Sequence, residues 1–263
     1  MRTVLRILGG LLIALLAVVV GVAASVPLGG LVTRNRVADL TDTTLPGMNG
    51  PDVAAYVARP PGEGPFPAVI MIHEFWGLRE DVVRKADVLA EEGYVVLAPD
   101  TMRGRSTDWL PTAIFQTVRT PEQEISADVQ AAFSWLRAQP RVDPARVAVM
   151  GFCFGGRAAL RFSLTEPQVA ATINLYGDTE TDVALLRTLP GPLLNIFGAD
   201  DAMLPQGEVQ VFRRALEAAA VPFEQRVYPG VGHAFVSADD PRTAGGAQAE
   251  AWAQIVRFLS KHL

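Results

Sequence analysis

Apolar runs alternate with amphipathic stretches along most of this chain. Runs rich in Val, Ile, Leu and Ala predict strands at 53–59, 67–73, 94–98, 147–150, 170–176, 192–197 and 223–228. Apolar residues at three- and four-residue spacing predict helices at 79–92, 121–139, 206–219 and from about residue 247 to the C-terminus. Continuous apolar runs are typical of strands buried on both faces. We therefore expect an α/β fold with a mostly parallel, doubly wound sheet.

The first 33 residues have a different pattern. Arg2 and Arg6 precede a stretch without charged residues from Ile7 to Thr33. About 20 apolar residues span a bilayer, and the apolar part of this stretch reaches that length. Small residues before Ser25 also resemble a signal-peptide cleavage site. Residues 1–33 are thus expected to be a signal peptide or an uncleaved signal anchor, so that the protein is membrane-anchored or secreted with its main domain outside the cytoplasm.

The rest of the chain is interpreted as a linker and one domain. Residues 34–52 carry Gly, Pro, Thr and Asp without helical periodicity, which indicates a linker and lead-in. Residues 53–263 then form the main domain, which is long enough for a full core. Within it, residues 101–119 are expected to be an irregular loop over a site. No stretch after residue 156 is long enough for a separate lid domain.

Composition excludes several classes of protein. The 263 residues are 49% hydrophobic and 19% charged, which excludes general disorder. The formal net charge is −5 without a dense Lys/Arg run, so no nucleic-acid partner is expected. The single cysteine, Cys153, allows neither an intramolecular disulfide nor a Cys-based zinc site. His73-Glu74 could begin an HExxH motif, but Gly77 occupies the second histidine position, so no metal is expected.

Cys153 lies in a glycine-rich turn. The apolar run that ends at Met150 continues as Gly-Phe-Cys-Phe-Gly-Gly into the helix-forming segment Arg157-Ala158-Ala159-Leu160. Strand, sharp turn and helix form the pattern of a nucleophile elbow, here with cysteine in place of serine. The N-terminus of the following helix favours a thiolate. Glycine-flanked cysteines also occur in ordinary turns, so the choice between a nucleophile and a structural cysteine depends on which residues can act with Cys153.

Two strand ends supply candidate partners for the cysteine. A cysteine nucleophile needs a base, and the base needs a carboxylate that orients it. In an α/β-hydrolase these groups follow the nucleophile in the order acid, then histidine. Asp200 and Asp201 come directly after the strand at 192–197, and His233 follows the strand at 223–228. Both positions suit a triad.

From about Asp52 to the C-terminus the chain resembles the dienelactone hydrolase family of α/β-hydrolases. The resemblance lies in the glycine-flanked cysteine, a strand-end Asp followed four residues later by proline, a Gly-His-Ala-Phe segment and an early turn, Glu74-Phe75-Trp76-Gly77. Because Pro205 lies four residues after Asp201, the resemblance selects Asp201 over Asp200. It implies that Cys153 is the nucleophile, His233 the base and Asp201 the orienting acid.

Glu74 resembles the family's carboxylate that contacts the resting thiol and moves when substrate arrives. A carboxylate beside Cys153 raises the pKa of the thiol and protects it from oxidation. The alternative is a simple ion pair of Glu74 with Arg79 or Arg103. The backbone N–H groups of Phe154 and Phe75 are expected to form the oxyanion hole.

The substrate pocket departs from the family pattern. The family holds a substrate carboxylate with arginines, one of them four residues after the catalytic histidine, where this chain has Ser237. Arg103 or Arg105 could match the family's other arginine, and Tyr176 resembles a pocket tyrosine. The loss of the first arginine suggests a less polar ester than an anionic lactone.

These observations predict a hydrolase that cleaves an ester or lactone through a Cys-His-Asp triad and a covalent acyl-enzyme, with no cofactor. Its partners are a small ester or lactone and, if the N-terminal segment is retained, the membrane. Two alternatives stay open. One is a general carboxylesterase or thioesterase, and the other is a non-catalytic hydrolase-fold module that binds a partner or lipid at the membrane. Trapping an acyl group on Cys153 separates them.

Overall fold

The computed structural model describes residues 16–26, 36–48 and 50–263. Its strands are β1 (Thr43–Leu45), β2 (Val53–Ala58), β3 (Phe66–Ile72), β4 (Val95–Pro99), β5 (Val142–Phe152), β6 (Ala171–Leu175), β7 (Leu193–Gly198) and β8 (Phe223–Tyr228). Its labelled helices are α2 (Glu80–Glu91), α3 (Leu110–Arg119), α4 (Glu122–Arg137), α5 (Phe154–Ser163), α6 (Val183–Leu186), α7 (Gln206–Ala219) and α8 (Gly246–His262). The bounds of the predicted strands and helices agree with these to within two residues, except that β5 begins five residues before the strand predicted at 147–150.

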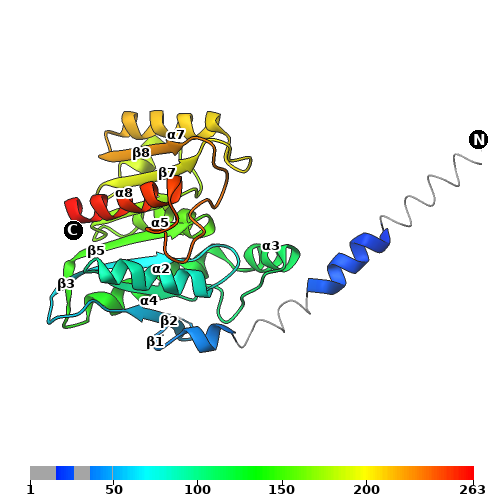
Figure 1. Ribbon diagram of the computed structural model, residues 1–263, viewed down its shortest axis with the longest axis horizontal. Helices are drawn as coiled ribbons and strands as arrows, with labels where there is room; N and C mark the ends of the chain where they lie inside the picture. Colours follow the sequence, from blue (N-terminus) through cyan, green and yellow to red (C-terminus); the bar gives the residue numbers. More distant parts are fainter. Residues whose placement is uncertain (1–15, 27–35, 49) are drawn as a thin grey trace, which may run out of the picture.

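The strands form one sheet in the order β1-β2-β4-β3-β5-β6-β7-β8 (Figure 1). β1 pairs antiparallel with β2, and β2 pairs antiparallel with β4. All other neighbouring pairs, from β4 to β8 in this order, are parallel. The predicted α/β-hydrolase architecture is therefore confirmed. In the described part of the chain, each connection returns to the sheet and none forms a separate lid domain.

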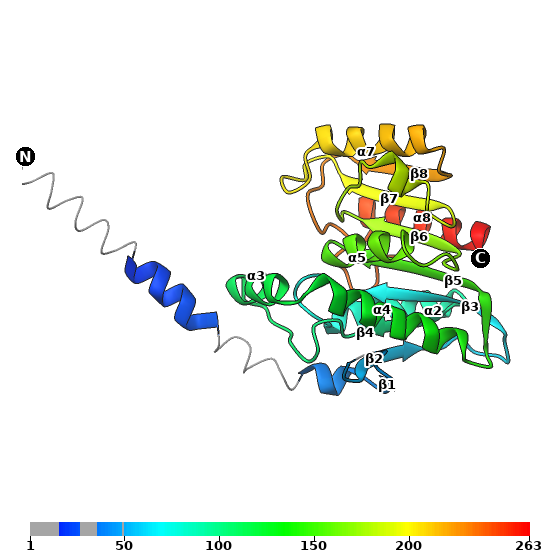
Figure 2. The ribbon, with the colours of Figure 1, turned by 180° about the vertical axis from the view of Figure 1, so that it is seen from behind.

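Alternate residues of the central strands face two different layers of helices. Val69 and Met71 of β3 pack in the core beneath α2 and α8, whereas Ala68 and Ile70 pack in the core beneath α4 and α5. Figure 1 shows the first layer in front, and Figure 2 shows the second. Burial on both faces explains why these strands are apolar throughout.

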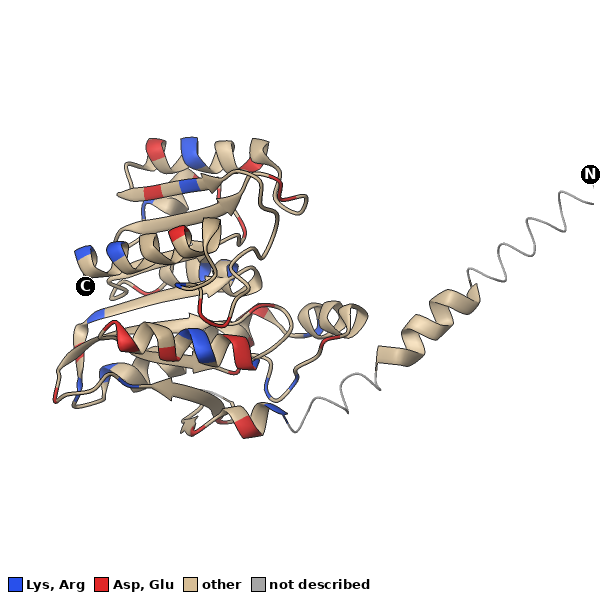
Figure 3. Cartoon of the chain, viewed as in Figure 1, with Lys and Arg blue, Asp and Glu red and all other residues tan. Residues whose placement is uncertain are grey.

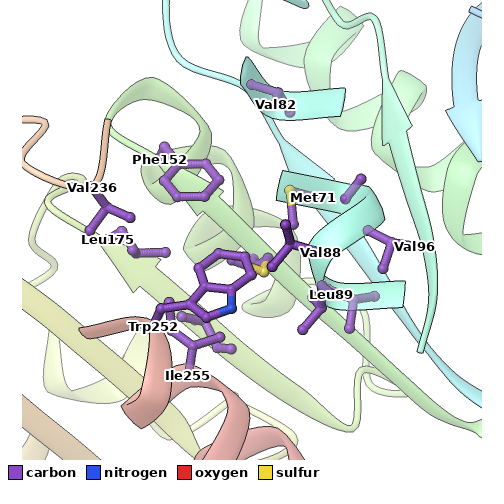
Figure 4. Close-up of a cluster of buried hydrophobic side chains, with 14 of the residues drawn as sticks. Met71, Val82, Val88, Leu89, Val96, Phe152, Leu175, Val236, Trp252 and Ile255 are labelled. Carbon is purple, nitrogen blue, oxygen red and sulfur yellow. The ribbon is translucent and has the colours of Figure 1, made fainter. Parts of the chain in front are cut away.

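A tightly packed core supports the strand that carries the cysteine. Trp252 of α8 is 1% exposed and lies in the same cluster as Met71, Phe152 and Leu175 (Figure 4). Phe152 is the last residue of β5 and directly precedes Cys153. The position of the cysteine is thus determined by a strand whose end is held from below by large apolar side chains.

Two regions differ from the sequence-based expectation. Part of the predicted linker at 34–52 belongs to the sheet, because β1 pairs with β2 and Leu45 is fully buried. Part of the predicted loop at 101–119 is the helix α3. Its apolar residues do recur at four-residue spacing, but Thr and Gln between them obscure the pattern, and they do not face the core.

The N-terminal prediction lies mostly outside the described residues. Residues 16–26 form a helix, whereas 1–15 and 27–35 are not described. Among the described residues, no helix combines the length and apolarity needed to cross a bilayer.

Candidate active site

Cys153 occupies a strained turn between β5 and α5. Its backbone has φ 52° and ψ −113°, a conformation that costs a non-glycine residue about 1–3 kcal/mol. The Cys153 N–H donates to the carbonyl of Leu175 at 2.9 Å, which ties the turn to β6. A Cβ on Gly151 would lie 2.2 Å from the backbone of Gly155, so the strand and the helix approach this closely only through glycine. This is the geometry of a nucleophile elbow.

Asp201 and His233 form the hydrogen-bonded pair that a cysteine nucleophile requires. The Nδ1 of His233 donates to Oδ2 of Asp201 at 2.7 Å, and the Asp201 side chain is fully buried. The other carboxylate oxygen accepts from the backbone N–H groups of Met203 and Leu204 at 2.8 and 3.1 Å. Asp200, in contrast, is exposed. The structure thus pairs His233 with the aspartate that the proline spacing selects.

Cys153, Asp201 and His233 gather at one edge of the sheet. They follow β5, β7 and β8, which are parallel, so their carboxyl ends point to the same side. With Nδ1 as donor, Nε2 of neutral His233 is an acceptor. Nε2 is buried and has no hydrogen-bond partner among the described residues. A general base for the thiol would need such an acceptor nitrogen without a partner.

The surroundings of Cys153 keep the thiol protonated. Burial, followed by the negative charge of Glu74, raises its pKa to about 12. A hydrogen bond from the backbone N–H of Phe154 opposes this and lowers the pKa, and the charges of Asp201 and Asp178 raise it further. The charge of Glu74 thus acts on the Cys153 thiol in the direction expected of a guarding carboxylate, and the guarding role itself stays a prediction.

A buried lysine lies near Glu74 and was not predicted. Lys85 of α2 is 1% exposed, donates to Asp81 Oδ2 at 2.9 Å and lies 5.6 Å from the ring centroid of Phe152. Glu74, Lys85, Asp81 and Ser237 all line a second cavity of about 380 Å³. Burial and the charge of Asp81 raise the pKa of Glu74, whereas Lys85 lowers it. The helical spacing from Val82 places Lys85 on the buried face of α2, and this could have revealed it.

The turn after β3 holds the second candidate oxyanion donor. The N–H of Gly77 donates to the carbonyl of Glu74 at 3.2 Å and closes the turn that contains Phe75. The side chain of Gln116 on α3 donates to the Phe75 carbonyl at 2.8 Å. His73, at the start of this turn, is buried and bonded to Thr101 at 3.1 Å, and burial lowers its pKa, as expected for a structural histidine.

A largely apolar cavity of about 330 Å³ opens beside the thiol. Its lining residues are Phe75, Ile114, Thr117, Val118, Cys153, Phe154, Arg157, Tyr176, Gly177, Asp178, Met203, Leu204 and His233. Tyr176 is buried with φ 38°, and its ring contacts that of His233 edge-on at 5.3 Å. The predicted pocket position of Tyr176 thus agrees with the structure.

The structure does not bring Arg103 and Arg105 to this cavity. Arg103 is bonded to Asp128 at 2.9 Å, and Arg105 donates to Thr120 at 2.8 Å. Both arginines lie in the loop that precedes α3 and are bonded to residues that follow α3, so the expected substrate contact is wrong for this cavity. The arginine that does line it is Arg157, which sequence reasoning missed although it lies one helical turn after the cysteine.

We expect Glu74→Gln to increase the rate of iodoacetamide alkylation of Cys153 about tenfold at pH 8, because loss of one carboxylate charge lowers the thiol pKa. The measurement is mass spectrometry of the single cysteine over time.

Since the pKa of the Cys153 thiol is about 12, the wild-type alkylation rate should rise about tenfold per pH unit between pH 7 and 10.

Glu80→Gln is the matched control, because Glu80 is exposed on α2 and bonded to Arg84. An unchanged alkylation rate in Glu74→Gln, or an equal increase in Glu80→Gln, contradicts the guarding role of Glu74.

The sheet order, the elbow and the strand-end Asp–His pair define the class of this protein as an α/β-hydrolase. The family model described as "Dienelactone hydrolase family" matches residues 53–263, and the chain belongs to this family.

Relatives and solved structures agree with this assignment. The chain is 30% identical over 235 residues to the Escherichia coli (strain K12) protein named "Putative carboxymethylenebutenolidase", covering 84% of this chain and 86% of the relative. A Klebsiella pneumoniae structure titled "Putative Dienelactone Hydrolase" superimposes with a TM-score of 0.74 at 30% identity, covering 83% of this chain and 97% of that one. A dienelactone hydrolase-like promiscuous phosphotriesterase from metagenomic libraries, at 23% identity and a TM-score of 0.72 over 84% of this chain and 97% of that one, shares the fold. The protein is a dienelactone hydrolase-like hydrolase.

Proposed function

We propose that this hydrolase cleaves uncharged carboxylic esters or lactones through a Cys153-His233-Asp201 triad. The observation that carries the proposal is the 2.7 Å hydrogen bond from His233 to the buried Asp201, on the same edge of the sheet as the strained Cys153. A binding module has no need of a buried Asp–His pair beside a cysteine in strained geometry.

Catalysis begins when substrate entry separates Glu74 from the thiol. The proton of Cys153 then passes to Nε2 of His233, and the thiolate attacks the carbonyl carbon of the ester. Asp201 holds the imidazole in the required tautomer and stabilises its positive charge.

The backbone N–H groups of Phe154 and Phe75 donate to the tetrahedral oxyanion. Collapse of the tetrahedral species breaks the bond to the alkoxy group, which leaves as the alcohol with the proton from His233. Water, deprotonated by His233, then attacks the thioester carbonyl. This releases the acid and restores the Cys153 thiol.

A covalent acyl-enzyme is the testable intermediate. Because Cys153 is the only cysteine, rapid acid quenching during turnover of p-nitrophenyl acetate should give one acetylated species, with the acetyl group on the peptide that contains Cys153. A larger burst from thioester substrates than from esters favours the thioesterase alternative. Turnover without acylation of Cys153 overturns the mechanism. If the protein neither turns over the ester nor becomes acylated at Cys153, the result favours the binding module.

The cavity favours an uncharged substrate. Arg157 is the arginine that lines it in the described part of the chain, and its guanidinium lies 3.4 Å from Asp178 and 3.7 Å from Glu122. These two carboxylates offset its charge, and most other lining side chains are apolar. An anionic substrate group therefore finds little free positive charge.

We expect kcat/KM for p-nitrophenyl butanoate to exceed that for cis-dienelactone by at least about tenfold, roughly the value of one lost charge-assisted hydrogen bond. Steady-state kinetics on both substrates measures this. Preference for the lactone, lost in Arg157→Met but kept in Arg161→Met, would identify Arg157 as a carboxylate ligand and contradict the uncharged substrate class. Arg161 is a matched control because it also pairs with Glu122 but does not line the cavity.

The N-terminal segment extends the proposal to location. The uncharged stretch from Ile7 to Thr33 behind two arginines supports export or tethering of the hydrolase domain at a membrane. Fractionation of cells, with protease protection of the full chain, tests this. Recovery of the uncleaved chain in the cytosol overturns it.

A further inference from the structure

The helix α3 has its polar and apolar faces reversed relative to an ordinary surface helix. Its buried side chains are Thr112, Ala113 and Gln116. The large apolar side chains of this segment are instead about half exposed or more, with Val118 reaching 80%. We call these the α3 apolar face: Trp109, Leu110, Ile114, Phe115 and Val118. Since a helix that packs on a core buries its apolar stripe, this face is arranged for another partner.

The α3 apolar face continues into the mouth of the active-site cavity. Ile114 and Val118 are exposed and line the cavity. Met203, in the loop after β7, also lines it and is 68% exposed. Gln116, on the opposite side of α3, donates to the carbonyl of Phe75 in the oxyanion turn. The helix is therefore bonded to the catalytic edge while its apolar side chains project outward.

The N-terminal helix of residues 16–26 ends against α3. The indole N–H of Trp109 donates to the Ser25 hydroxyl at 2.9 Å, and the hydroxyl of Thr112 donates to the Val26 carbonyl at 3.2 Å. This helix leaves the α3 apolar face largely uncovered, because each side chain of that face stays at least 46% exposed. Figures 1 and 3 show the helix of residues 16–26 projecting away from the sheet on the side of α3.

Both exposed segments are almost free of charge. Residues 16–26 contain no charged residue, and Arg119 at the end is the single one in α3 (Figure 3). The Arg119 guanidinium lies 5.3 Å from the ring centroid of Phe115, at the edge of the apolar face. An apolar surface with a cation at its margin matches the boundary between acyl chains and phosphate headgroups.

We infer that the α3 apolar face docks on the surface of a phospholipid bilayer and opens the active site toward it. The inference deepens the proposed function and rests on it for one consequence: the substrate is an ester dissolved in the lipid, which reaches Cys153 past Ile114, Val118 and Met203. A bilayer is the occupant the structure favours, because the same uncharged chain segment that begins at residue 7 meets α3 at Ser25 and Val26.

The test uses the full chain with phosphatidylcholine vesicles whose acyl chains carry bromine, which quenches nearby tryptophan. Trp109 lies on the α3 apolar face. The difference in tryptophan fluorescence between the wild type and Trp109→Phe gives the contribution of Trp109 to the total signal. We expect strong quenching of Trp109 in the wild type and loss of at least half of that quenching in Leu110→Glu/Phe115→Glu. Neither residue lines the cavity. Val211→Glu on α7 is the matched control, since Val211 is 41% exposed and belongs to another helix.

Activity supplies a second readout. For p-nitrophenyl dodecanoate dissolved in phosphatidylcholine vesicles, the double variant should lose about tenfold in rate, while its rate on soluble p-nitrophenyl acetate stays within about twofold. No turnover of either ester by the wild type refutes the proposed function but leaves the quenching result valid. Absent quenching of Trp109, or equal losses in Val211→Glu, overturns bilayer docking. A shift from dimer to monomer in the double variant without vesicles would assign the face to a second copy instead.

Discussion

Replacing Cys153 by alanine is expected to lower kcat/KM for p-nitrophenyl acetate by at least about 10⁴-fold, or about 5.5 kcal/mol of transition-state stabilisation. The reason is that in the proposed mechanism Cys153 forms the bond to the acyl group, and the chain has no other cysteine to replace it. What little activity is left would come from the oxyanion hole and His233 acting on water. Steady-state kinetics on freshly reduced protein measures the effect.

The fold should survive this change. Alanine and cysteine meet the same restriction at φ 52°, so the backbone strain is equal in both, and only one partly buried sulfur is lost. Urea denaturation should therefore give a free energy of unfolding within about 1 kcal/mol of wild type. Cys153→Ser tests the chemistry further, because a hydroxyl in the same burial and beside the same Glu74 charge is far harder to ionise than a thiol. Retention of more than a tenth of the activity in Cys153→Ala means that another group is the nucleophile.

The positions of the three candidate triad residues could be predicted because they follow from strand order. Cys153, Asp201 and His233 each come directly after an apolar run, and parallel strands bring their carboxyl ends to one edge. Spacing alone left Asp200 and Asp201 open. The choice needed the resemblance to the family, and the structure adds a physical reason: only Asp201 turns its side chain inward to His233.

The pocket was less predictable because its side chains come from elements that sequence patterns describe poorly. Arg103 and Arg105 follow a strand end, as a pocket arginine would, but Asp128 and Thr120 bind them elsewhere. Lys85 lies on the buried face of α2, where its ammonium group donates to Asp81 one helical turn before it.

The helix α3 was missed for a related reason. Amphipathic patterns are interpreted with the apolar stripe facing the core, and here Gln116 and Thr112 face inward. What faces solvent, lipid or substrate depends on how a helix is anchored in three dimensions. For α3, one such anchor is the hydrogen bond from Gln116 to Phe75, which no local periodicity reveals.

Asp201→Asn is expected to lower kcat for p-nitrophenyl acetate by about 10³- to 10⁴-fold with little change in KM. Asparagine has nearly the same shape, and its carbonyl oxygen can still accept from Met203 and Leu204. Its amide would then face Nδ1 of His233 with a donor. To accept this hydrogen bond, Nδ1 must be unprotonated, so the proton of the neutral imidazole lies on Nε2. A protonated Nε2 cannot take the proton of Cys153.

Asp200→Asn is the matched control, since it makes the same chemical change one residue earlier in the same loop. The Asp200 side chain is exposed, and its backbone N–H, which donates to Val231 at 3.0 Å, is unaffected by the substitution. Its kcat should stay within about twofold of wild type. A large loss in Asp200→Asn with a harmless Asp201→Asn would mean that the orienting acid is Asp200 and that the assignment to Asp201 is wrong. Equal and small losses in both would mean that His233 acts without an orienting carboxylate. Only a loss confined to Asp201→Asn, with unchanged unfolding, agrees with a base whose tautomer is set by the 2.7 Å hydrogen bond.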